Sequence, residues 1–209
     1  MKKVTVLGAG SWASAISNII ADRSEVTMYA RRQDQADEIN EKHTNSRYLG
    51  DAPLLPSIRA TSSLEDAIQG ADLIITGVPT QQTRKVLEEA KSYIPKDVHL
   101  MNISKGIERG SGKRISQIVE ELLPGQEFAV LSGPSHAEEV IIDQPTTVVI
   151  ASSNTALAED LQDLFMDPTF RVYTGTDVVG VELGAAVKNI LAIAIGIADG
   201  RGLGDNPKA

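Results

Sequence analysis

The chain has 209 residues, of which 42% are hydrophobic, and a formal net charge of −8. Its length and apolar content suffice for one large domain, or for one domain and part of another. The acidic balance argues against a surface that binds nucleic acid or inserts into an anionic membrane, so an anionic ligand would need local lysines and arginines. The chain has no cysteine and no signal-peptide pattern before its first strand, so we expect a cytoplasmic protein without disulfides.

A short strand, a glycine turn and a helix open the chain. Residues 4–7 are mostly apolar, Gly8 and Gly10 interrupt them, and residues 11–21 have the small and apolar pattern of a helix. This order is typical of a dinucleotide-binding βαβ unit, in which the first glycine permits a tight turn and the second lets the backbone approach a pyrophosphate. The N–H groups at the start of the helix would bind that anion. The third position of the glycine pattern is Ala13, which the pattern allows.

Two arginines follow the second predicted strand, residues 25–30. About twenty residues after the glycines, a protein that binds NAD usually has an acidic residue on the ribose 2′-hydroxyl. Arg31 and Arg32 occupy this place instead, and guanidinium groups suit the 2′-phosphate and adenine of NADP(H). We therefore favour NADP(H) as the cofactor. NAD(H) stays an alternative, as do two solvated arginines that open the next helix.

Strands and helices alternate as far as residue 174. The predicted helices are 33–43, 64–68, 80–93, 114–123 and 155–165, and the predicted strands are 58–61, 72–79, 98–104, 128–131, 146–151 and 171–173. Residues 44–57 are expected to form a loop, and Thr80 to cap the helix that it begins. The alternation predicts a doubly wound, Rossmann-type α/β domain over residues 1–176, with ligands at the carboxyl ends of its strands. Residues 177–209 would then start a second, helical domain.

A long glycine- and alanine-rich helix begins near residue 178. Its apolar run, 178–198, is interrupted by Glu182, Lys188 and Asn189, and central charges are costly in lipid, so we expect a buried helix of a soluble protein. Glu182 and Asn189 would share one helix face. A buried Lys188 could exchange a proton near neutral pH and act as an acid/base group. The alternative is a structural lysine whose ammonium group reaches solvent.

Two further segments follow predicted strands. Lys105 has the position of a ligand for phosphate or carbonyl oxygen, or it is a surface lysine in a turn. Residues 133–137 would bring backbone N–H groups to an anion, with Ser135 as N-cap, or they form only a capped helix. Trp12 is a better candidate for a cofactor contact than Tyr48, because it lies in the first turn after the glycines. The three histidines lack metal-ligand spacing, so we predict no metal site.

Together these segments resemble the bacterial-type NAD(P)-dependent sn-glycerol-3-phosphate dehydrogenases. The matching motifs, in chain order, are Gly8-Ala9-Gly10-Ser11-Trp12, Ser104-Lys105-Gly106, Leu131-Ser132-Gly133-Pro134-Ser135-His136-Ala137, Ala186-Val187-Lys188-Asn189 and Gly202-Leu203-Gly204-Asp205-Asn206. Ala13 and Ser14 depart from the Gly-Thr that the family usually has after the tryptophan. The resemblance extends over the whole chain.

The resemblance implies a role for each matching residue. The dinucleotide would be contacted by Gly8, Gly10, Ser11, Trp12, Arg31, Arg32, Lys105 and Ala137. The phosphorylated three-carbon substrate would be bound by Lys105, Gly133, Ser135 and Lys188. Lys188 would be the general acid/base, with Asn189 and Lys105 in the same catalytic group. The implied reaction is the reduction of dihydroxyacetone phosphate to sn-glycerol 3-phosphate, which supplies phospholipid synthesis.

The family continues past the position of residue 209 as a helical domain with an aspartate and a Ser-Arg-Asn group. The resemblance therefore implies an incomplete, inactive fragment that carries the first helix of a truncated all-helical domain. No nucleic-acid partner and no membrane insertion are expected, and a homodimer is left open. The alternatives are a stand-alone dinucleotide-binding module and a related hydroxy-acid dehydrogenase.

Overall fold

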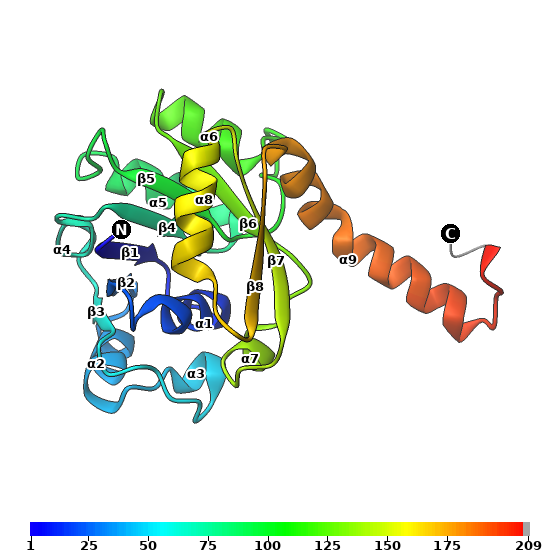
Figure 1. Cartoon of the computed structure of the whole chain (residues 1–209), viewed down its shortest axis with the longest axis horizontal. Coiled ribbons are helices and arrows are strands. Elements are labelled where there is room, and N and C mark those ends of the chain that lie inside the picture. Colours follow the sequence, from blue (N-terminus) through cyan, green and yellow to red (C-terminus); the bar gives the residue numbers. More distant parts are fainter. Residues whose placement is uncertain (207–209) are drawn as a thin grey trace.

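A mostly parallel sheet forms the body of the protein. The structure is a computed structural model and describes residues 1–206. Within these residues the sheet has eight strands in the order β3-β2-β1-β4-β5-β6-β7-β8, and helices cover both of its faces (Figure 1). The strands are β1 (Lys3–Leu7), β2 (Glu25–Tyr29), β3 (Arg59–Thr61), β4 (Leu73–Thr76), β5 (His99–Asn102), β6 (Phe128–Ser132), β7 (Thr146–Ser152) and β8 (Phe170–Gly175). The helices are α1 (Ser11–Ile20), α2 (Gln33–Lys42), α3 (Ser46–Leu49), α4 (Leu64–Ile68), α5 (Thr80–Ala90), α6 (Ile115–Leu122), α7 (Ala137–Val140), α8 (Thr155–Phe165) and α9 (Val178–Gly200).

The central strands are apolar because both faces of the sheet are buried. In β4, Leu73 and Ile75 belong to the core cluster that also contains apolar residues of α1 and α8. Ile74, between them, belongs to the second cluster, with residues of α5 and α6. Successive side chains of a strand point to opposite faces, so this strand joins the two halves of the core. The predicted doubly wound fold is confirmed.

Two local predictions differ from the structure, and the direction of one strand was not predicted. The predicted loop 44–57 contains the short helix α3. Strand β7 is antiparallel to β6, because the connection holds only the one-turn helix α7 and not the full crossover helix that a parallel return requires. Thr80 is the first residue of α5 and does not cap it, since its hydroxyl instead donates a 2.8 Å hydrogen bond to the carbonyl of Lys105.

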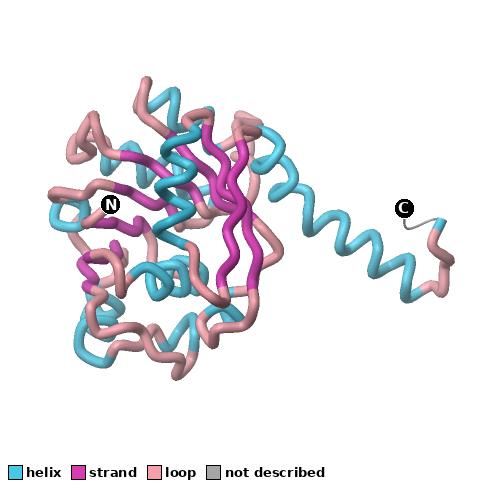
Figure 2. Tube along the Cα trace, viewed as in Figure 1, coloured by secondary structure: helices cyan, strands magenta, loops and turns pink. Residues whose placement is uncertain are grey.

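Helix α9 leaves the sheet and extends away from it, as Figures 1 and 2 show. Its start is capped by Asp177, whose carboxylate accepts a hydrogen bond from the N–H of Gly180 at 2.8 Å. The prediction of a buried helix is wrong for this chain: within α9 only Glu182 and Ala198 are buried, because only its first part meets the sheet. Among residues 1–206, α9 alone is long and apolar enough to cross a membrane, by length and composition. The last three residues of the predicted segment 177–209 lie outside the described part of the chain.

Candidate functional site

The glycine turn between β1 and α1 uses its two glycines for different reasons. Gly8 has φ +128°, and a β-carbon there would lie 2.8 Å from the carbonyl oxygen of Gly77, so the backbone itself requires glycine. Gly10 has φ −82°, which any residue adopts, and a β-carbon there would meet no atom within 4 Å. The space beside Gly10 is therefore open. No side chain caps the helix that follows it.

The third position of the glycine pattern is filled by an alanine without loss of close packing. A β-carbon on Gly77, at the end of β4, would lie 3.0 Å from the β-carbon of Ala13. The pattern expects a glycine at position 13 of the helix. Here the small residue at this contact is Gly77, which directly follows β4. Helix and sheet still approach closely, as a dinucleotide-binding turn requires.

Two adjoining cavities lie at the carboxyl ends of the strands. The first has a volume of about 500 Å³ and is lined by the glycine turn, Arg31, Arg32 and Tyr48, among others. The second has a volume of about 430 Å³. Both include Gly10, Tyr48 and residues 77–79, so they are two parts of one groove. The predicted residues that line the second cavity are Gly10, Ser11, Trp12, Lys105, Ser135 and Ala137.

The first cavity has a positive wall. Arg31 is exposed and Arg32 is half-buried. The Nε of Arg32 lies 3.1 Å from a carboxylate oxygen of Asp34 in an ion pair, which offsets part of its charge. Arg47 lies in the same wall. A phosphate group would find several guanidinium donors here.

Lys105 lies in the second cavity, on the loop after β5. Its Nζ is 3.4 Å from the hydroxyl oxygen of Ser135 and 5.9 Å from the centre of the Trp12 ring. Burial lowers the pKa of Lys105 from its ordinary value, and the nearby positive charge of Lys188 lowers it further. The two lysines, far apart in the sequence, are therefore close enough to repel each other. An anion between them would relieve that repulsion.

Gly133 and Ser135 follow β6. A β-carbon on Gly133 would lie 2.7 Å from the carbonyl oxygen of Thr147 in β7, so sheet packing alone accounts for this glycine. The prediction of Ser135 as N-cap is wrong: the residue before α7 is His136, and no side chain caps the helix. The hydroxyl of Ser135 instead lies 3.3 Å from the carbonyl oxygen of Gly133 as a hydrogen-bond donor. It accepts from Lys105 on the cavity side.

Lys188 and Asn189 lie on α9. Lys188 is half-buried and Asn189 exposed. The sequence left a buried Lys188 and one that reaches solvent as alternatives, and the structure places it between the two. The predicted polar patch of Glu182 with Asn189 does not form. Glu182 is instead buried, and its carboxylate lies 2.7 Å from a guanidinium nitrogen of Arg114. It also accepts hydrogen bonds from the N–H and the hydroxyl of Ser116, at 2.8 Å and 2.6 Å.

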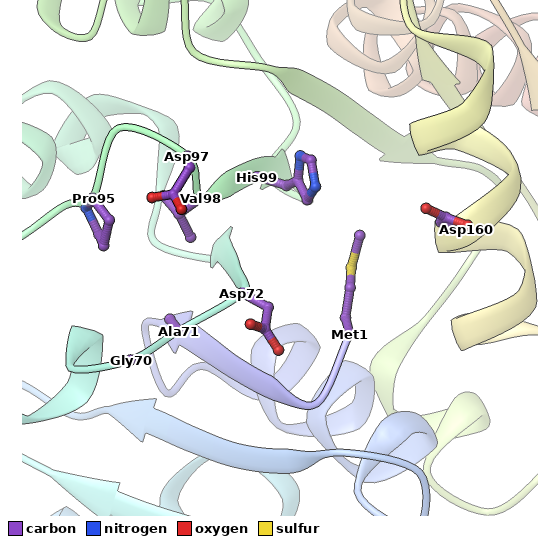
Figure 3. A pocket seen from close by; sticks show the side chains of 9 residues that line it. All are labelled: Met1, Gly70, Ala71, Asp72, Pro95, Asp97, Val98, His99 and Asp160. Carbon is purple, nitrogen blue, oxygen red and sulfur yellow. The ribbon is translucent and has the colours of Figure 1, made fainter.

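A third cavity, lined mainly by acidic and apolar residues, lies at the amino ends of the strands. It has a volume of about 360 Å³, and its lining includes Asp72, Asp97, His99 and Asp160 (Figure 3). Hydrogen bonds from the N–H groups of Lys3 and Lys2 lower the pKa of Asp72, so this carboxylate stays ionised. Its three carboxylates make this cavity less suited to a phosphate group than the groove at the carboxyl ends. Within residues 1–206 no cluster of three or more histidine or acidic side chains could hold a metal ion.

Comparison with known families shows which family the chain belongs to. The N-terminal model of the NAD-dependent glycerol-3-phosphate dehydrogenases matches residues 3–158, and the C-terminal model matches residues 177–209. The chain belongs to this family. This membership argues against the related hydroxy-acid dehydrogenase family that the sequence left as an alternative.

Individual glycerol-3-phosphate dehydrogenases are similar along the whole chain. The glycerol-3-phosphate dehydrogenase [NAD(P)+] of Bacillus velezensis is 52% identical and that of Bacillus pumilus 50%, each over all of this chain. The chain spans 62% of the length of both relatives. The crystal structure of glycerol-3-phosphate dehydrogenase from Coxiella burnetii is 35% identical with a TM-score of 0.90, covering 99% of this chain and 64% of that one. The enzyme from Plasmodium falciparum is 31% identical with a TM-score of 0.92, covering 99% of this chain and 61% of that one.

Sequence reasoning missed three residues around this groove, Gln35, Asn45 and Arg47, and ranked a fourth, Tyr48, below Trp12. Arg47 and Tyr48 line the first cavity, and they come from α3, which was expected to be loop. Gln35, which also lines the first cavity, and Asn45, which is buried, both donate hydrogen bonds from their side chains to the carbonyl of Ala9. No local pattern reveals such contacts, because the partners are separated by 26 and 36 positions.

Proposed function

We propose that this chain binds NADP(H), with NAD(H) as the alternative cofactor, through the groove at the carboxyl ends of its strands. The observation that carries this proposal is the continuous groove that joins the glycine turn, Arg31 and Arg32 at one end to Lys105 at the other. This order of residues suits an extended ligand with a phosphate in the middle and a reactive end beside a lysine.

Two features of the groove suit a dinucleotide. The open space at Gly10 would admit a pyrophosphate against the backbone. The indole Nε1 of Trp12 is buried and has no hydrogen-bond acceptor among the described residues. A buried donor of this kind is costly unless a ligand supplies an acceptor. Gly8, Gly10, Ser11, Trp12, Arg31, Arg32, Lys105 and Ala137 are the residues that we propose as cofactor contacts.

We further propose that a protein of the relatives' length reduces dihydroxyacetone phosphate to sn-glycerol 3-phosphate in the cytoplasm, for phospholipid synthesis. When bound, the nicotinamide supplies the hydride. Lys105, with the hydroxyl of Ser135 and the backbone at Gly133, would hold the phosphorylated substrate. Lys188, with Asn189 beside it, would protonate the alkoxide that forms as the carbonyl is reduced, and its ammonium charge would stabilise that oxygen in the transition state.

The assignment of residues 1–176 to a dinucleotide-binding domain and of residues 177–209 to the start of a helical substrate-binding domain belongs to the same proposal. It is supported by the position of Asp177, which caps α9 at the proposed boundary, and by the two separate family models that match on either side.

The cofactor proposal is tested by titrating this chain with NADPH and NADH. The chain has a single tryptophan, and Trp12 lines the groove, so its fluorescence should be quenched by energy transfer to the reduced nicotinamide. Saturable quenching at one dinucleotide per chain is the expected result. An unchanged signal, together with no heat of binding in calorimetry, would reject cofactor binding by this chain.

The catalytic proposal is tested in a protein of the relatives' length. Lys188→Met should lower turnover by about 10³-fold or more and leave NADPH affinity nearly unchanged, because general acid catalysis and charge stabilisation are both lost. Near-normal turnover would remove Lys188 from the catalytic role.

A further inference from the structure

A buried cluster of side-chain amides holds the middle residue of the glycine turn. The carbonyl oxygen of Ala9 accepts hydrogen bonds from Nε2 of Gln35 at 2.6 Å and from Nδ2 of Asn45 at 3.0 Å. The two amides are also bonded to each other, Nε2 of Gln35 donating to Oδ1 of Asn45 at 3.1 Å. Nδ2 of Asn45 donates in addition to the hydroxyl of Ser14 at 2.8 Å. Gln35 is 6% exposed, and Asn45 and Ser14 are completely buried.

The two amide nitrogens and the carbonyl oxygen of Ala9 make all the hydrogen bonds that they can make. Each amide nitrogen has two hydrogens, and both nitrogens make two hydrogen bonds. The carbonyl of Ala9 accepts two, which occupies both of its lone pairs. Buried polar networks that are fully satisfied in this way fix one geometry. The carbonyl of Ala9 is therefore held facing the protein interior.

The orientation of this carbonyl determines the orientation of the next N–H. A peptide unit is planar and trans, and the structure has no cis bond among its described residues. The N–H of Gly10 consequently points opposite to the carbonyl of Ala9, away from Gln35 and Asn45. Gly10 lines both parts of the groove.

We propose that Gln35 and Asn45 are positioning residues that hold the Ala9–Gly10 peptide with its N–H toward the pyrophosphate of the dinucleotide. This inference rests on the proposed cofactor binding. Without the two amides this peptide could rotate and turn the negative end of its dipole toward the groove. Part of the ordering that an anion would otherwise impose on the turn is thus already present in the folded chain.

The same two residues join the turn to the adenosine end of the groove. Gln35 lies in the first turn of α2, directly after Arg31 and Arg32, and Asn45 directly precedes α3, which carries Arg47 and Tyr48. Gln35 also lines the first cavity with these arginines, but the hydrogen bonds of both amides go to Ala9, to Ser14 and to each other. Their loss should therefore weaken binding of the pyrophosphate and spare binding of the adenosine portion.

The test is the variant Asn45→Leu, which keeps the size of the side chain and removes its donors. Wild type is first titrated with NADPH and NADH, and the tighter dinucleotide is used throughout, together with its adenosine portion alone (adenosine 2′-monophosphate or adenosine). We expect the dinucleotide to bind about ten- to hundredfold more weakly, as for the loss of one charge-assisted hydrogen bond. The affinity for the adenosine portion should change by less than about threefold, because that ligand has no pyrophosphate.

A matched control separates positioning from stability. Asn40 lies on α2 and its amide also bonds backbone, donating to and accepting from Ala60 at 2.8 Å in each case, but it does not touch the turn. Asn40→Leu should lower the unfolding midpoint and leave the dissociation constant of the dinucleotide within about threefold of wild type. If Asn45→Leu does not fold, Gln35→Met takes its place, with the same expectation.

These experiments distinguish failure of the positioning role from failure of the cofactor proposal. A wild-type chain that binds no dinucleotide rejects cofactor binding itself. Dinucleotide binding that survives in Asn45→Leu or Gln35→Met at wild-type affinity overturns the positioning role and leaves the cofactor proposal intact. An equal loss for the dinucleotide and for its adenosine portion also overturns it, because the amides would then support the groove as a whole.

Discussion

Adding a side chain should have opposite effects at the two glycines of the turn: at Gly10 it should abolish dinucleotide binding, and at Gly8 it should destabilise the fold. At Gly10 the backbone angle φ of −82° and the open surroundings accept a side chain, so Gly10→Val should fold. The expected loss of stability is about 1 kcal/mol, the difference between glycine and an aliphatic residue at a helix N-cap. Its side chain would, however, occupy the space through which the pyrophosphate approaches.

The magnitude for binding follows from the contacts that are lost. A pyrophosphate displaced from the helix start loses at least two charge-assisted hydrogen bonds of about 1.5–3 kcal/mol each. Dinucleotide affinity should therefore fall by about 10²–10⁴-fold. At Gly8, by contrast, φ is +128° and a β-carbon would lie 2.8 Å from the carbonyl oxygen of Gly77. Backbone strain and overlap together should cost about 2–6 kcal/mol of folding free energy in Gly8→Ala.

Urea unfolding and calorimetric titration with NADPH measure the two effects on the same samples. The expected pattern is a folded Gly10→Val chain that does not bind and a Gly8→Ala chain with a much lower unfolding midpoint. Gly10→Val with wild-type affinity would refute the assignment of the turn to the pyrophosphate. Gly8→Ala with wild-type stability would refute the packing argument.

Three other predictions concern charged groups. Arg31→Ala combined with Arg32→Ala should lower the affinity for NADPH by about ten- to hundredfold per arginine and the affinity for NADH far less. Equal losses of affinity for the two dinucleotides in parallel titrations would show that these arginines do not recognise the 2′-phosphate. Lys188→Met should raise the pKa of Lys105 toward its ordinary value of 10.5, because a neighbouring positive charge is removed, and NMR titration of ¹³C-methylated lysines would detect the shift or its absence. Glu182→Leu should lower the free energy of unfolding by about 2–4 kcal/mol, since the guanidinium of Arg114 and the N–H of Ser116 lose their buried acceptor; a change below about 0.5 kcal/mol in urea unfolding would contradict this.

The fold was predictable from the sequence because its signals are local. The glycine turn, the apolar run of β4 and the glycine- and alanine-rich sequence of α9 each lie within a short stretch of chain. Apart from α3, which lies in a predicted loop, the strands and the longer helices were expected within a few residues of their observed bounds. The antiparallel β7 was not expected, because strand direction depends on how the connection folds and not on the composition of the strand.

The side-chain contacts were less predictable, because a polar side chain can bond either to the neighbouring helix end or to a group that only the folded chain brings near. Thr80 and Ser135 have residue types that favour helix caps, but both hydroxyls bond to backbone carbonyls on neighbouring loops or turns. Helical spacing predicted Glu182 near Asn189, but it gives no information on Arg114, which precedes α6 and pairs with Glu182 in the structure. Gln35 and Asn45 showed no signal at all, because a buried amide is recognised only by the distant carbonyl that it meets.

The acid-lined cavity at the amino ends of the strands (Figure 3) also has a consequence for how a ligand arrives. The chain carries a net charge of −8, but Arg31, Arg32 and Lys105 lie at the opposite edge of the sheet. These three side chains gather positive charge at the groove of a chain whose net charge is negative. Such local positive charge would attract an anionic ligand to the groove and so guide its encounters to that edge. Such guidance is screened by salt, and the association rate of a dinucleotide should fall with ionic strength more steeply than its dissociation rate changes.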